Sequence, residues 1–257
     1  MRTELTLSLA TLYGFLLVLA RVTAALTFVP LPGVRQSPSA ARVVLGLALT
    51  VLLFPQWPSV PEQVSMGRLL GWLVLDAGLG ILIGLGVGFV TEAFQIAAQA
   101  VGLEAGFAYA YMVDPQTQAD SGVLLIFAQL AAGLIFFALG LDREVVRIFA
   151  RSVETFPPGA WLPSAPAVDA ILRLGTGMFS TGLRLALPAL ALLTLMDLAL
   201  ALLGRLNAQL QLLTLSFPVK LLAAVAVLVW LVPLFPRVLG AYGWQVFKGL
   251  RAVIENP

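Results

Sequence analysis

Small and polar residues recur at helical spacing through an otherwise apolar stretch near the middle of the chain. Successive steps of 4, 4, 3, 4, 3 and 4 residues bring seven of them onto one helical face, within about 80° of one another. The residues between them are mostly Leu, Val, Phe, Ala and Ile. The pattern predicts one long helix with a narrow stripe, here called the central stripe, formed by Gly84, Gly88, Glu92, Gln95, Gln99, Gly102 and Gly106.

The central stripe allows two interpretations. Lipid cannot solvate Glu92, Gln95 or Gln99, so the stripe must face protein or water. Its glycines would let a second backbone approach closely along the same line. The stripe therefore predicts either ordinary packing inside one membrane bundle or contact with an assembly partner or a polar pore.

The remaining apolar runs predict an all-α integral membrane protein with about six to eight apolar helices. No alternation typical of strands is present at hairpin spacing. Residues 122–141 form a run whose only strongly polar member is Gln129, long enough to cross a bilayer. The other runs are short, charged or broken by proline, and they cover residues 5–29, 40–54, 69–111, 174–203, 206–217 and 221–235.

Breaks between these runs indicate the organisation of the chain. We expect a single domain over residues 1–257, with a central helix unit at 69–111 and a break at 107–121. A C-terminal helical block is expected at 174–238, where Pro188 should kink or split the helix. Residues 142–155 predict an amphipathic helix with Asp142 as N-cap and a Glu144–Arg147 pair.

Composition excludes several classes of function. Apolar residues make up 60% of the chain and charged residues 11%, against about 25% charged in soluble domains. The absence of Cys and His excludes disulfides, imidazole catalysis and Cys/His metal sites, and we expect no cofactor. A net charge of +2 gives no nucleic-acid footprint. Residues 5–29 are expected to be a retained helix rather than a signal peptide.

Several ionisable residues fall inside the apolar runs, and each costs about 2.5–3.5 kcal/mol at the centre of a bilayer. They are Arg21, Asp76, Glu92, Glu104, Arg184, Asp197 and Lys220. These groups either line a water-filled path or meet other subunits. Two further possibilities involve Asp197. It could form an ion pair with Arg184, within or between subunits, or a protease dyad with Asp76, but no flanking motif supports the dyad. Lys220 is either a lysine at a helix end that extends its charge to the membrane interface or a contact to a partner protein.

Several short motifs follow one another along the chain in a fixed order. The long central helix and the break after it contain Ala98, Gly102, Gly106, Asp114 and Pro115. Later motifs contain Ser152, Pro157, Ala186, Leu187, Pro188, Arg205, Gln209, Leu210, Phe217, Pro218 and Lys220. This ordered set resembles the FliR family of flagellar export-apparatus proteins and its injectisome counterparts. The sequence departs from the family pattern at Ala208, Gln211, Leu213, Ser216 and Asp142-Arg143.

The resemblance implies a non-enzymatic subunit of the flagellar-type III protein export gate in the bacterial inner membrane, at the flagellar basal body. Its helices would pair as hairpins, and its buried charges would meet neighbouring subunits. FliP-like and FliQ-like proteins, and a FlhB-like one, are the implied partners, with exported proteins as substrates. The family's plug would correspond here to Phe107, Tyr109, Tyr111 and Met112, before Asp114 and Pro115; the alternative is that these residues only anchor a helix end.

Two other functions stay open at this point. A stand-alone transporter of small solutes or ions would line its own path with the buried charges, although no clear inverted repeat is visible. An intramembrane aspartyl protease would need Asp76 and Asp197 to share a proton. The sequence leaves open the choice between flagellum and injectisome, the stoichiometry, the substrates, the order of gating and the topology.

Overall fold

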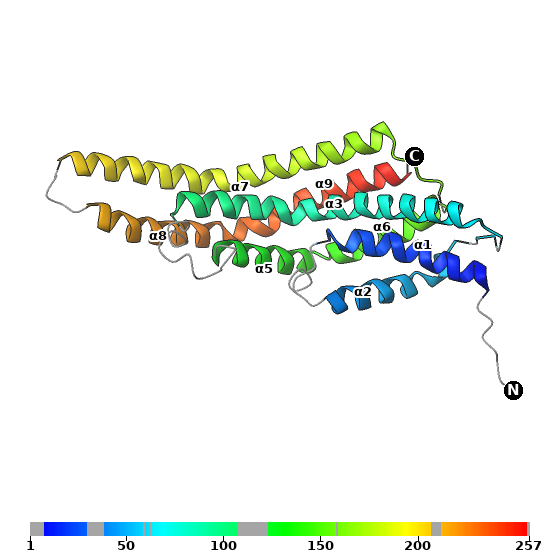
Figure 1. Cartoon of the computed structure of the whole chain (residues 1–257). Helices are drawn as coiled ribbons and strands as arrows, with labels where there is room; N and C mark the ends of the chain where they lie inside the picture. Colours follow the sequence, from blue (N-terminus) through cyan, green and yellow to red (C-terminus); the bar gives the residue numbers. More distant parts are fainter. Residues whose placement is uncertain are drawn as a thin grey trace. The chain divides into compact units, whose positions relative to one another are not determined.

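The computed structural model describes residues 8–29, 39–58, 60–61, 63–106, 123–157, 159–206 and 212–255. Over these residues the backbone forms helices joined by turns, and it contains no strand (Figure 1). The all-α prediction is therefore confirmed. The chain divides into two compact units: unit 1 comprises Met1–Phe89, Gly140–Gly175 and Gly243–Pro257, and unit 2 comprises Val90–Leu139 and Thr176–Tyr242. A single functional domain over 1–257 stays a prediction.

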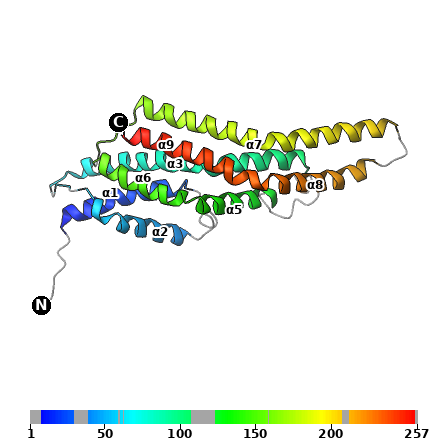
Figure 2. The same cartoon turned by 180° about the vertical axis from the view of Figure 1, so that it is seen from behind.

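Unit 1 is built from α1, α2, α6 and the parts of three longer helices that fall within it. Their bounds are α1 Leu9–Leu26, α2 Ser39–Leu52, α3 Met66–Glu104, α6 Leu141–Thr155, α7 Ala165–Leu206 and α9 Phe235–Glu255. Ser8 caps α1, because its hydroxyl accepts a hydrogen bond from the amide of Thr11. In both views α1 and α2 run side by side (Figures 1 and 2).

The core of unit 1 is apolar and draws on four of these helices. Each of its large side chains contributes about 1.5–3 kcal/mol on burial. The most completely buried of them are Leu17, Val22, Leu79, Ile83, Leu141, Ile148, Phe149, Phe247, Leu250 and Ile254. This core fixes the backbone positions of α1, α3 and α6, which carry the polar cluster described below.

Unit 2 contains the end of α3, α5 (Val123–Ala138), most of α7, α8 (Leu212–Leu231) and the start of α9. Phe94 and Phe235 pack edge to face with ring centroids 4.7 Å apart. Phe136 and Leu193 are fully buried. The yellow end of α7 and the orange helix α8 lie side by side as a hairpin in both views (Figures 1 and 2).

Four helical segments of the described chain, one of them running from α8 into α9, are long and apolar enough to cross a membrane. They cover Leu9–Leu26, Met66–Glu104, Ala165–Arg205 and Pro218–Glu255. The segments Leu124–Ala138 and Leu141–Thr155 would add a fifth if they count as one broken span. Length and composition thus support the membrane assignment.

The predicted clean span at 122–141 is shorter than expected. Helix α5 ends at Ala138, and Gly140 adopts a left-handed conformation (φ 69°) before α6 begins at Leu141. Only glycine enters this region without steric cost, so the break occurs there. The prediction that Asp142 is an N-cap is wrong, because Gly140 occupies that position and Asp142 lies in the first turn.

Helix ends elsewhere also differ from expectation. Helix α3 ends at Glu104 rather than near Tyr111, and Gly106 lies beyond it with φ 82°. Pro188 and Pro218 lie inside continuous helices, so neither splits its segment. Pro236 directly follows the predicted run 221–235, and it lies in the first turn of α9, where the missing amide hydrogen removes no helical bond.

Candidate functional site

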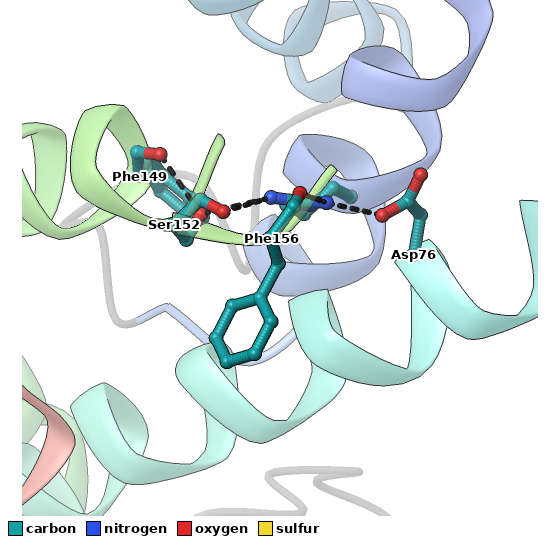
Figure 3. Close-up of polar contacts among 5 residues, drawn as sticks. Asp76, Phe149, Ser152 and Phe156 are labelled. Carbon is teal, nitrogen blue, oxygen red and sulfur yellow. Dashed lines mark hydrogen bonds and ion pairs between the residues drawn. The ribbon is translucent and has the colours of Figure 1, made fainter. Parts of the chain in front are cut away.

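A buried arginine joins three segments of unit 1. The guanidinium of Arg21 in α1 forms an ion pair with the carboxylate of Asp76 in α3. It also donates to the carbonyl oxygens of Ser152 (2.5 Å) and Phe156 (3.2 Å), in α6 and at its end (Figure 3). The Arg21 cluster therefore ties α1, α3 and α6 together through charge-assisted hydrogen bonds.

The Arg21 cluster is almost completely closed to solvent. The side chains of Arg21 and Asp76 are 4% and 3% exposed. Ser152 is fully buried, and its hydroxyl donates to the carbonyl of Phe149 (Figure 3). Only the Nε of Arg21 lacks a partner among the described buried side-chain atoms. The sequence offered a water-filled path or contact with other subunits for Arg21 and Asp76, and both are wrong for this pair, because each neutralises the other within the chain.

Glycines of α3 bring it close to α1 next to this cluster. A Cβ on Gly80 or Gly84 would overlap the backbone of Arg21 or Ala25, and one on Gly88 would lie 2.9 Å from the carbonyl oxygen of Phe28. The first part of the central stripe thus packs inside unit 1. Gly80 precedes the stripe by one further step of four residues, which is the signal that the sequence reading missed.

A second group of charges in unit 1 surrounds the buried carboxylate of Glu144. This carboxylate pairs with Arg147 on the same helix and with Arg251 of α9, so the predicted Glu144–Arg147 pair is confirmed. Arg151 pairs with Glu255 at the surface. Helix α6 is therefore anchored to α9 by ion pairs in addition to its apolar face.

In unit 2 the polar part of the central stripe forms a chain of amides. Gln129 of α5 donates to the side-chain oxygen of Gln95 (3.0 Å), and Gln95 donates to Glu92 (3.3 Å). Gln95 is 6% exposed, whereas Gln99 is exposed. A Cβ on Gly102 would meet Leu124 of α5 at 3.5 Å. Most of the described stripe therefore contacts this chain's own helices.

Lys220 links two helices of unit 2 by its charge. Its ammonium lies 2.6 Å from a carboxylate oxygen of Asp197 in α7 and 3.7 Å from one of Glu104 at the end of α3. An Arg184–Asp197 pair within the chain is therefore wrong, since Asp197 is held by Lys220. Arg184 is exposed, and none of the described ion pairs involves it.

The remaining predicted site residues fall in different settings. Pro188 and Arg205 lie in α7, Arg205 exposed in its last turn, and Phe217 and Pro218 lie in the helical backbone of α8. The predicted plug, which comprises Phe107, Tyr109, Tyr111, Met112, Asp114 and Pro115, lies outside the described residues, as does Gln209.

The described geometry offers structural rather than chemical roles to these groups. No cluster of three or more carboxylates suited to a metal ion occurs within the described ranges. Asp76 and Asp197 each pair with a basic side chain, so neither is arranged as half of a proton-sharing dyad. A cleft of about 350 Å³ in unit 2 is lined by apolar side chains of α3, α5, α7, α8 and α9.

Residues 12–243 match the family model described as bacterial export proteins, family 1. The chain belongs to this family. Among its relatives, the flagellar biosynthetic protein FliR of Escherichia coli (strain K12) is 28% identical over 238 residues, which cover 93% of this chain and 91% of that protein. FliR of Bacillus subtilis (strain 168) is 25% identical over 219 residues, with 84% and 85% covered.

A secretion-system protein is also similar. The apparatus protein SsaT of Salmonella typhimurium (strain LT2) is 27% identical over 221 residues, covering 82% of this chain and 83% of SsaT. The similarity to bacterial export proteins thus extends over nearly the whole chain, and the family match includes Arg21, Asp76 and Lys220. The resemblance inferred from the short motifs is confirmed at the level of the family.

Proposed function

We propose that this protein is a non-enzymatic subunit of the type III protein export gate in the bacterial inner membrane, at the flagellar basal body. In this role it helps to form the pore through which unfolded flagellar proteins leave the cell. Its membership of the bacterial export proteins and its similarity to two FliR proteins over most of their length support the proposal. FliP-like, FliQ-like and FlhB-like proteins are the proposed partners.

The exposure of its apolar helices is the structural observation that favours a subunit. In the most apolar windows of α7 and of the α8–α9 segment, only 22% and 17% of residues are buried. Large exposed side chains there include Phe179, Leu187, Leu195, Val229 and Trp230. Such a surface can be covered by lipid or by the membrane helices of neighbouring subunits. Small residues and polar groups at the contact would stabilise the packing of those helices.

The internal pairing of charges argues against a self-contained solute pathway. Asp76 and Lys220, which a transporter would present to water, are instead paired with Arg21 and Asp197. Each ion pair holds helices of its own unit together: Arg21–Asp76 in unit 1 and Asp197–Lys220 in unit 2. The path for exported proteins is then formed by several subunits together, and this protein contributes some of the helices that surround it.

Deletion and co-purification test this function. Removing the gene should abolish secretion of flagellar proteins and motility, and restoring it should recover both. A tagged copy extracted in mild detergent should bring down the FliP-like and FliQ-like proteins in stable ratio. Recovery of a homogeneous monomer that transports a small solute in vesicles would instead establish the transporter and reject the export role.

A further inference from the structure

One lysine of unit 2 serves two carboxylates that belong to different helices. The ammonium of Lys220 in α8 lies 2.6 Å from an oxygen of Asp197 in α7 and 3.7 Å from one of Glu104 in α3. The Lys220 side chain is 17% exposed, whereas those of Asp197 and Glu104 are 45% and 33% exposed. The two carboxylates therefore share one largely buried cation, and they hold it unequally.

The contacts with the two carboxylates differ in kind. The Asp197 oxygen accepts a hydrogen bond from Lys220, and charge-assisted bonds of this kind are the strong ones. At 3.7 Å no hydrogen bond forms to Glu104, and only the attraction of opposite charges remains. Asp197 thus fixes Lys220 to the hairpin of α7 and α8, and the contact with Glu104 is the one that can open.

Glu104 is the last residue of α3, which is an unfavourable place for a carboxylate. The free carbonyl groups at the C-terminus of a helix carry partial negative charge, so an acidic side chain there loosens the last turn. The amide of Gly106 closes this turn by donating to the carbonyl of Leu103 (3.2 Å), and Gly106 then leaves the helix with φ 82°. The turn is therefore more stable with a cation beside Glu104.

Lys220 is the cation that compensates for Glu104. No other ion pair within the described ranges involves Glu104. The hydroxyl of Thr194 lies 3.5 Å from a Glu104 oxygen, but it donates to the carbonyl of Leu190 at the shorter distance of 2.7 Å. The charge of Lys220 is thus the main support of the carboxylate at the end of α3.

We propose that Lys220 acts as a latch between the α7–α8 hairpin and the end of α3. Asp197 keeps the ammonium in place, and the contact with Glu104 opens and closes. While the contact is closed, the cation neutralises the carboxylate at the end of α3 and the last turn stays helical. When the contact opens, that turn unwinds. The latch lies within unit 2 and does not depend on the export role.

Hydrogen–deuterium exchange of the full chain in mild detergent tests the latch at the amides of residues 101–106. Amides at a helix end exchange through local opening rather than global unfolding. Lys220→Met leaves Glu104 charged and without a cation, so exchange there should become about three- to fivefold faster, the size of a charge effect at a helix end. In a chain that already carries Glu104→Gln, Lys220→Met should change the rate less than about twofold, because no charge is left to compensate.

Two further variants separate the latch from a general loosening of unit 2. Asp197→Asn leaves the ammonium with Glu104 as its carboxylate partner, so exchange at residues 101–106 should not rise above the wild type. Thr194→Val removes only the neighbouring hydroxyl and should also leave the rate unchanged. Added salt should speed exchange in the wild type, because screening weakens a partly exposed contact, but it should have no such effect in Lys220→Met.

Equal exchange at residues 101–106 in the wild type and in Lys220→Met would overturn the proposal. An increase of the same size in the Glu104→Gln background would also overturn it, because Lys220 would then act through Asp197 alone. These results leave the export function untouched, since co-purification tests that function separately.

Discussion

Arg21 and Asp76 lie in different helices, 55 residues apart, and form an ion pair inside unit 1. The same guanidinium reaches two carbonyls at the end of α6. A single side chain thus fixes α1, α3 and α6 against one another. The sequence alone suggested a water-filled path or other subunits for these charges, but Arg21 and Asp76 pair within the chain.

Removing the carboxylate should be strongly destabilising. In Asp76→Ala the buried guanidinium of Arg21 loses its anion, and we expect unit 1 to lose about 3–5 kcal/mol of stability. Thermal or denaturant unfolding of the detergent-solubilised protein measures the loss. The double variant Arg21→Leu with Asp76→Leu should recover much of it, and equal stability of Asp76→Ala and the wild type would contradict the ion pair.

Adding a methyl group at the contact between α3 and α1 should force the helices apart. Gly84→Ala brings a Cβ into the backbone of Ala25, and overpacking of this kind costs about 1–3 kcal/mol. Gly71→Ala is the matched control in the same helix, because its Cβ would meet nothing within 4 Å. Alanine there should leave the melting temperature unchanged or raise it, since glycine is the poorer helix former.

Lys220→Met should weaken unit 2. The change leaves Asp197 and Glu104 without their shared cation, and a half-buried pair of this kind contributes roughly 1–2 kcal/mol. Lys248, which is exposed in α9, provides the control Lys248→Met, with an expected effect within about 0.5 kcal/mol. Similar melting temperatures for the two variants would show that the Lys220 contacts contribute nothing.

The plug assignment predicts a leak rather than a loss of stability. Replacing both Tyr109 and Met112 with glycine removes side chains that fill irregular space. If these residues close the pore, the assembled gate should conduct ions at rest, which a membrane-potential dye or planar-bilayer recording detects. Glycine at Leu103, which is exposed at the end of α3, is the control. An unchanged leak would remove the plug assignment alone.

The helical class and the membrane character were predictable because they depend on local pattern. Long apolar runs and the absence of strand alternation can be recognised from residues that are close together in the sequence. Several helix ends were not predictable. Pro218 was expected to break its segment and Pro188 to kink or split its helix, yet neither ends a helix, because packing and local adjustment can offset one missing hydrogen bond. The left-handed Gly140 was overlooked within an apolar run.

The candidate sites divide along the same line. The central stripe was visible in the spacing of its residues, and the motif set identified the family. The long-range partners of the buried charges were not visible in the sequence. Arg21 and Ser152 are 131 residues apart, and Glu144 and Arg251 are 107 residues apart.

Sequence by itself determined which residues are too polar for lipid, because the cost of burying a charge depends on the side chain and its apolar neighbours along the helix. Only the tertiary structure decided which of those charges are already neutralised, because an ion pair depends on atoms from distant segments meeting within a few ångströms. Asp76 and Lys220 have partners inside the chain, whereas none of the ion pairs among the described residues involves Arg184.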